Sequence, residues 1–167
     1  MSGAVVWMTG LPSSGKSTFA QRLFARLHEA GRPAALLDGD AVREALVPKP
    51  GYGAADRDAF YATLAHLAAL LARQDLVVLV AATAHRRAWR DAARSLSPQF
   101  VEVYMDVSQS ECRRRDAKGL YARAAEGKAQ DLPGADVLYE PPRAPEVLAR
   151  GGEDTFAVEE VLQRLRH

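Results

Sequence analysis

The sequence predicts an α/β fold in which a mostly parallel central sheet carries helices on both of its faces. Two observations predict it. Short β-like apolar runs alternate along the chain with longer stretches whose apolar residues recur at helical spacing, and this alternation is typical of strand-helix-strand units. The 167 residues are also enough to bury a core around such a sheet without disulfides or metals. We therefore expect a single domain over residues 1–167.

The first half of the chain supplies two strands and two helices. Residues 4–8, "AVVWM", predict a buried first strand. Apolar residues at helical spacing over 19–27 predict the first helix, which Gly and Pro end in "EAGRP". Residues 34–37, "AALL", predict a second strand that ends at Asp38, and residues 56–73 carry the apolar face of a long helix.

The second half of the chain supplies two more strands and a long loop. Residues 76–82, "LVVLVAA", are the most continuously apolar run, so we expect a central strand there that is buried on both faces. Residues 100–106, "FVEVYMD", predict another strand. Residues 47–55 and 127–145 are rich in Gly and Pro and are expected to be loops.

Composition gives no sign of a large polyanionic or membrane partner. The chain has 22 Lys and Arg against 21 Asp and Glu, so its net charge of +1 does not favour nucleic acid or an anionic membrane surface. No run reaches the roughly 18 apolar residues of a membrane span, and no secretion signal precedes the first strand. The one cysteine, Cys112, cannot form an internal disulfide. We expect a soluble, unprocessed, cytoplasmic protein.

A phosphate-binding loop follows the first strand. In "GLPSSGKST", Gly10 is followed after four residues by Gly15, Lys16 and Ser17, which is the P-loop pattern in its usual place between a strand and a helix. Backbone N–H groups there can surround phosphate oxygens, Lys16 can reach the β- and γ-phosphates, and the Ser17 hydroxyl can bind Mg²⁺. The residues expected to bind the donor nucleotide here are Gly10, Leu11, Pro12, Ser13, Ser14, Gly15, Lys16, Ser17 and Thr18.

A P-loop serves switches, motors and kinases alike, so the activity has to come from other residues. A guanine-nucleotide switch reads its base with an Asn-Lys-x-Asp element, but the chain contains no Asn. A motor ATPase carries acidic residues at the end of a strand, but "LVVLVAATAH" has none. A small-molecule kinase needs carboxylates near the acceptor hydroxyl and a mobile basic lid.

Both kinase features are present. Asp38 and Asp40 follow the second strand beside the P-loop, where open α/β sheets bind ligands. Asp40 could alternatively be the N-cap of a helix that begins after it. The stretch "ECRRRDAKGLYARAAEGK" is strongly basic, with Gly119 and Gly127 as candidate hinges of a lid. It could alternatively be a solvated charged helix face.

These motifs together resemble one known family. "GLPSSGKST", "LLDGDAVR", the "DR" pair at Asp56, "FVEVYMDVSQSEC", "RDAKGLYARAAEGK" and "YEPPRAPEV" are similar in order to adenylylsulfate kinase, from about Val5 to about Leu148. The resemblance implies the P-loop NTPase fold with a basic lid at about 113–134. It also implies phosphorylation of the 3′-hydroxyl of adenosine 5′-phosphosulfate (APS), with ATP as donor and Mg²⁺ as cofactor. Partners would be small nucleotides, and a homodimer is left open.

The family's roles transfer to particular positions. Lys16, Asp38 and Asp40 become the catalytic residues, with Mg²⁺ held by Ser17 and, through water, by Asp38. Arg115 matches the arginine near the donor nucleotide. The expected acceptor-binding residues are Asp40, Arg43, Tyr52, Arg57, Thr83, Lys118, Gly119, Leu120 and Leu132, among which Arg43 and Arg57 would hold the phosphosulfate and Tyr52 and Leu132 would cover the adenine.

The sequence departs from the family's pattern in the acceptor site. Phe60 stands where the family has Asn, residues 83–86 replace Ile-Ser-Pro-Phe, and residues 131–134 replace Asn-Phe-Thr-Gly. His85 is left open between an acceptor contact and a structural role. Two alternatives therefore accompany the kinase for APS: a kinase of the same fold for another nucleotide-linked anion, and a non-catalytic nucleotide-binding protein.

Overall fold

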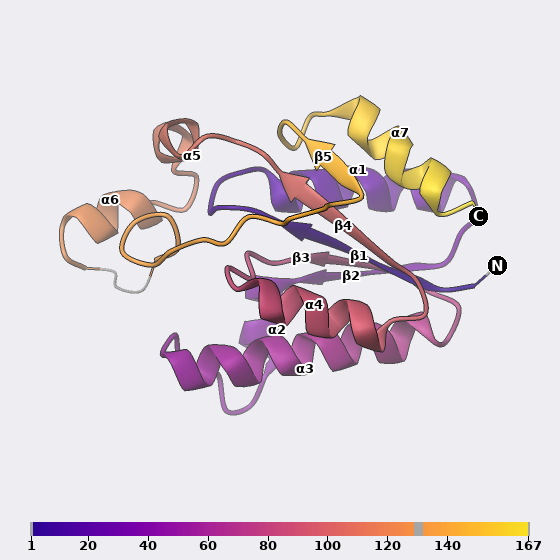
Figure 1. The fold of residues 1–167 in the computed structure, drawn as a ribbon, viewed down its shortest axis with the longest axis horizontal. Coiled ribbons are helices and arrows are strands. Elements are labelled where there is room, and N and C mark those ends of the chain that lie inside the picture. The colour runs from indigo at the N-terminus through magenta and orange to yellow at the C-terminus, as the bar shows by residue number, and fades with distance from the viewer. Residues whose placement is uncertain (1, 129–131, 167) are drawn as a thin grey trace.

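Five parallel strands form one sheet in the order β2-β3-β1-β4-β5 (Figure 1). The computed structural model describes residues 2–128 and 132–166. The strands are β1 (Ala4–Thr9), β2 (Ala34–Asp38), β3 (Val77–Ala81), β4 (Phe100–Met105) and β5 (Val147–Ala149). The most apolar run forms β3, which is buried throughout but is not the middle strand. The middle strand is β1. An apolar run cannot distinguish the middle strand from its neighbours, because every interior strand of a parallel sheet is buried on both faces.

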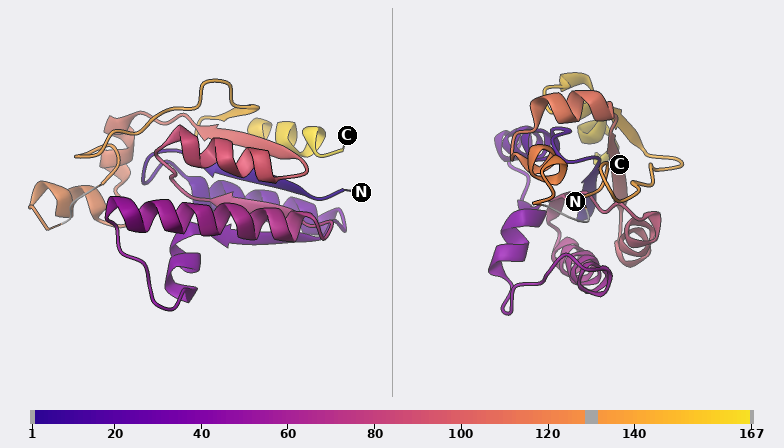
Figure 2. Two further views of the ribbon diagram at one scale, coloured as in Figure 1. Left: turned by 60° about the horizontal axis from the view of Figure 1, so that its bottom comes forward. Right: turned by 90° about the vertical axis from the view of Figure 1, so that its left-hand side faces the viewer.

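Helices cover both faces of the sheet, as the sequence predicts. In Figures 1 and 2, α1 and α7 lie on one face and α3 and α4 on the other. The helices are α1 (Lys16–Glu29), α2 (Gly39–Ala45), α3 (Ala54–Ala72), α4 (Arg87–Leu96), α5 (Gln109–Arg115), α6 (Leu120–Ala125) and α7 (Thr155–Arg164). No helix in the described ranges is long and apolar enough to cross a membrane.

The side chains of β1 divide the core into two layers. Val6 and Met8 pack with α1 and α7, whereas Val5 and Trp7 pack with α3 and α4, because successive strand residues point to opposite faces. Trp7 is fully buried and its Nε1 donates a hydrogen bond to the Ala82 carbonyl at 3.2 Å. The two layers fix the ends of the central strands, and the residues that follow these ends form the candidate site.

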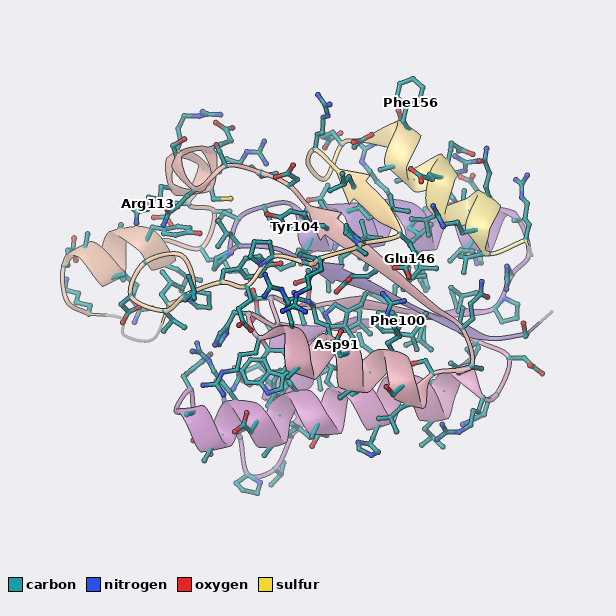
Figure 3. All side chains as sticks on the ribbon, in the orientation of Figure 1. Asp91, Phe100, Tyr104, Arg113, Glu146 and Phe156 are labelled. Atoms are coloured by element: carbon teal, nitrogen blue, oxygen red, sulfur yellow. The ribbon has the colours of Figure 1, made fainter. Side chains whose placement is uncertain are left out.

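The basic segment forms two short helices beyond the carboxyl ends of the strands. Figure 1 shows α5 and α6 extending past the sheet at that edge, and Figure 3 places Arg113 between them. Cys112, Tyr121 and Leu132 form a small apolar cluster of their own. Of the residues predicted for the lid, 129–131 lie outside the described ranges. The segment therefore contains its own packing rather than one continuous charged helix.

Candidate active site

The P-loop joins β1 to α1 and is shaped by a glycine that no other residue could replace. Gly15 is the N-cap of α1 with a φ of 95°, and a Cβ there would lie 2.5 Å from the Gly152 backbone nitrogen. No side chain of the described residues caps α1. The N–H groups of its first turn are therefore available to an anion, and the helix dipole favours one there.

Lys16 lies folded over the P-loop. Its Nζ donates hydrogen bonds to the Gly10 carbonyl at 3.0 Å and to the Leu11 carbonyl at 2.8 Å. Burial, and secondarily the charge of Lys118, lower the pKa of Lys16 to about 8. A phosphate chain in the loop would stabilise the charged ammonium, because an anion nearby opposes both effects.

The two carboxylates after β2 have different local roles. Asp38 is the N-cap of α2, since its Oδ1 accepts hydrogen bonds from the backbone nitrogens of Asp40 at 3.0 Å and Ala41 at 3.4 Å. The alternative that Asp40 is the cap is therefore wrong, because the helix begins at Gly39, two residues before Ala41, where a helix capped by Asp40 would begin. Asp40 lies in the first turn of α2 and its carboxylate pairs with the Lys118 ammonium.

Asp38 also contacts the P-loop helix. Ser17 Oγ donates a hydrogen bond of 2.7 Å to Asp38 Oδ2. This contact places a hydroxyl and a carboxylate oxygen together at the start of α1, and such oxygen donors suit Mg²⁺, which takes the rest of its shell from water and phosphates. The described residues contain no cluster of three His, Cys, Asp or Glu that could hold a metal alone.

One cleft at the carboxyl edge of the sheet brings most of the predicted residues together. The predicted residues that line it are Pro12, Ser13, Gly15, Lys16, Ser17, Thr18, Asp38, Asp40, Arg43, Tyr52, Arg57, Thr83, Arg115, Lys118, Leu120 and Leu132. Gly10, Leu11, Ser14 and Gly119 do not line it. Gly119 has a φ of 66° and is the N-cap of α6, so its contribution is to the turn that places Lys118 and Leu120.

His85 lines the same cleft and is a neutral side chain. It is 5% exposed, its ring meets the edge of Trp89 at 4.8 Å between centroids, and its Nδ1 has no hydrogen-bond partner among the described residues. Burial, followed by the charge of Arg57, lowers the pKa of His85 to about 4. The imidazole therefore offers one donor and one acceptor nitrogen rather than a positive charge.

A second cleft adjoins the outer side of the P-loop. Gly15, Thr18 and Arg115 line it together with residues that the sequence analysis missed, namely Arg150, Gly151, Gly152, Glu153 and Asp154. Asp154 N-caps α7 through the Ala157 nitrogen and also accepts a hydrogen bond from the Arg150 nitrogen at 2.9 Å. The Gly-Gly-x-Asp pattern before a helical stretch was the available signal for this turn.

Comparisons with known proteins agree with this geometry. The family model described as "Adenylylsulphate kinase" matches residues 2–150. The chain is 37% identical to adenylyl-sulfate kinase of Synechococcus sp. (strain JA-3-3Ab), covering 98% of this chain and 94% of that protein. It is 41% identical to adenylyl-sulfate kinase of Paraburkholderia xenovorans, covering 98% of this chain and 90% of that protein.

Two further similarities extend the comparison. The chain is 44% identical to the bifunctional enzyme NodQ of Azospirillum brasilense, of whose length the match covers 27%. Among solved structures, the Mycobacterium tuberculosis APS kinase CysC in complex with AMPPNP and APS superposes with a TM-score of 0.92 and 36% identity, covering 99% of both chains. The fold, the P-loop and these full-length similarities together show that the chain belongs to the adenylylsulphate kinase family.

Proposed function

We propose that the protein transfers the γ-phosphoryl group of ATP to the 3′-hydroxyl of APS. The observation that carries the proposal is the cleft, where a P-loop, a carboxylate that is not used as a helix cap and several cationic side chains meet at one edge of the sheet. The similarity to an APS kinase solved with AMPPNP and APS supports the same donor and acceptor.

The donor would lie across the two clefts. Its phosphates would fit the N–H groups of the P-loop and Lys16, and its base and ribose would fit the second cleft beside Arg115 and Arg150. Ser17 and, through water, Asp38 would hold Mg²⁺, which neutralises charge on the phosphates when bound.

The acceptor hydroxyl would lie at Asp40. The carboxylate orients the 3′-hydroxyl and takes its proton as the new O–P bond forms and the bond between the γ-phosphorus and the β,γ-bridging oxygen breaks, which releases ADP. Lys16 follows the transferring group, and Lys118 brings a second cation beside Asp40. Positioning and charge neutralisation provide the catalysis, since no covalent intermediate is needed.

Purified protein with Mg²⁺, ATP and a panel of nucleotide acceptors tests the proposal. We expect phosphorylation of APS and little phosphorylation of adenosine 5′-monophosphate, which lacks the sulfate. Lys16→Ala should lower turnover by at least ~100-fold, whereas Lys49→Ala, at an exposed lysine paired with Glu44, should leave it unchanged. Turnover of another nucleotide-linked anion alone would support a different acceptor, and ATP binding without turnover would support a non-catalytic protein.

Three expectations remain as proposals. The chain would act as one kinase domain in which residues 113–134 form a lid over the cleft, since α5 and α6 extend beyond the strand ends there. Its cytoplasmic location and its association into a homodimer are predictions that fractionation and analytical ultracentrifugation can check.

A further inference from the structure

Arg43 is a buried cation with no anionic partner in the described part of the chain. It lies in the last turn of α2, lines the main cleft and is only 5% exposed. Its Nη1 donates hydrogen bonds to the carbonyls of Gly51 at 2.8 Å and Pro50 at 3.4 Å. No described carboxylate lies within ion-pair distance. Because a buried charge without a counter-charge is costly, this arrangement indicates an anionic ligand.

Two aromatic rings hold the guanidinium of Arg43. Its Cζ lies 4.3 Å from the centroid of the Tyr52 ring and 4.2 Å from that of the Phe60 ring. We call this pair, Tyr52 and Phe60, the aromatic clamp. Each such cation–π contact is worth about two- to thirty-fold in an equilibrium constant. The rings therefore restrain Arg43 without neutralising its charge, which a carboxylate would do.

The two members of the clamp differ in exposure. Tyr52 is 53% exposed, so part of its ring remains available to a ligand, whereas Phe60 is 3% exposed. Phe60 also meets the Tyr61 ring edge-on at 5.2 Å, which fixes it within α3. Phe60 also lines the main cleft beside Arg43, so its ring can act on a ligand through Arg43 as well as by direct contact.

We propose that Phe60 is a positioning residue that sets the affinity for the acceptor by orienting Arg43. Nε and Nη2 of Arg43 make no hydrogen bond to a described residue, so they remain for the phosphosulfate. A planar guanidinium recognises such an anion through paired N–H groups, and restraining it beforehand lowers the ordering cost of binding. The proposal rests on the proposed function for the identity of the acceptor.

Steady-state kinetics of Phe60→Leu test the proposal, since leucine keeps an apolar side chain but removes the ring. We expect the KM for APS to rise about tenfold, with the KM for ATP and kcat within about twofold. Phe60→Tyr restores a ring and should return the KM for APS to within about threefold of that of the unaltered chain. An unchanged KM for APS in Phe60→Leu would overturn the proposal.

Phe100→Leu is the matched control. The Phe100 ring makes the same kind of contact, with the Arg94 guanidinium 4.8 Å away, but it lies at the amino end of β4 on the α4 side of the sheet (Figure 3) and outside the cleft. Its loss should leave the KM for APS unchanged. A rise equal to that of Phe60→Leu would show a general effect of losing a ring.

Arg43→Gln separates the clamp from other effects of Phe60. In that background Phe60→Leu should raise the KM for APS less than twofold, because the cation on which the ring acts is gone. A full tenfold rise there would overturn the proposal. If the unaltered chain does not phosphorylate APS, the proposed function fails instead. In that case, crystal structures of the unaltered chain and of Phe60→Leu would still test whether Phe60 positions Arg43. Arg43 should move away from Tyr52 in Phe60→Leu, and an unmoved Arg43 would overturn the proposal.

Discussion

At the scale of single residues, Asp40 can now be altered without touching the cap of α2. Asp38 provides that cap, and Asp40 contacts only the exposed Lys118 among the ion pairs of the described residues. Asp40→Asn should lower kcat by at least ~100-fold, because the amide cannot take the hydroxyl proton. The melting temperature and the Kd for ATP should stay close to those of the unaltered chain, since an exposed ion pair contributes little.

Differential scanning fluorimetry and calorimetric ATP titration, run beside the kinetics, check the prediction for Asp40. Asp75→Asn is the control, because Asp75 is an exposed turn residue with a φ of 64°, a conformation that Asn also adopts. Full activity of Asp40→Asn would remove Asp40 from the mechanism.

His85 gives the stability of the protein an acid-sensitive component. Its pKa is lowered from 6.5 to about 4, chiefly by burial. Between these pH values His85 is protonated in the unfolded chain but neutral in the folded chain. Its contribution to stability is therefore fully present above about pH 6.5 and is lost as the pH falls toward about 4. The melting temperature should therefore fall more between about pH 7 and about pH 5 in the unaltered chain than in His85→Asn.

The exposed His66 on α3 provides the control for that measurement. His66→Asn should keep the pH dependence of the unaltered chain. If the melting temperature fell equally with pH in the unaltered chain and in His85→Asn, His85 would not be the cause of the acid sensitivity.

At the scale of elements, contiguous patterns in the sequence were sufficient for much of the structure. The strands β1 to β4, the helices α1 and α3 and the P-loop were each predicted from one short stretch. The helix α4 was missed because one of its two buried residues is Arg90, which interrupts an apolar face. The strand β5 has only three residues, too few to show a period.

Local sequence patterns also predicted some residues of the candidate site and missed others. Lys16 and Asp38 were predictable because each lies in a recognisable local motif. The contact of Phe60 with Arg43 and the loop at 150–154 depend on side chains from different elements meeting in the folded chain. Neither hydrophobic periodicity nor a local sequence motif predicts a contact of this kind.

The loop between β5 and α7 packs directly on the P-loop, so its shape should affect the donor. A Cβ at Gly152 would lie 2.7 Å from Thr18 Cβ and 3.0 Å from the Gly15 carbonyl oxygen. Gly152→Ala should displace the wall of the second cleft and raise the KM for ATP at least about fivefold, with the KM for APS nearly unchanged. Gly53→Ala, where a Cβ meets no atom within 4 Å and φ is −64°, should change neither constant.

Initial-rate measurements with each substrate varied in turn check the prediction for Gly152. An unchanged KM for ATP in Gly152→Ala would show that the loop can shift without affecting the donor site.

At the scale of the whole molecule, one buried arginine joins the sheet to the loops that form the cleft. Arg90 is 1% exposed, and its Nε donates to Glu102 Oε2 on β4 at 2.9 Å. Its Nη1 donates to the Ala84 carbonyl at 2.5 Å and its Nη2 to the Glu140 carbonyl at 2.6 Å. The side chain thus connects α4, β4, the segment after β3 and the segment before β5, so folding and site assembly are coupled through it.

Replacing Arg90 alone should lower the free energy of unfolding more than replacing Arg90 and Glu102 together. After Arg90→Met, the buried Glu102 keeps one ion-pair partner among the described residues, Arg94, whose Nη2 lies 3.6 Å away, and we expect a loss of about 3 kcal/mol in the free energy of unfolding. Glu102→Gln added to Arg90→Met removes the stranded charge and should recover at least about 1 kcal/mol. Urea denaturation of the two single variants and the double variant measures this coupling, with the exposed Arg22→Met as a control expected to lose under about 1 kcal/mol. If the losses in the free energy of unfolding of the two single variants added up to that of the double variant, Arg90 would act through its carbonyl contacts alone. The ion pair between Arg90 and Glu102 would then contribute nothing to the connection between the sheet and the loops that form the cleft.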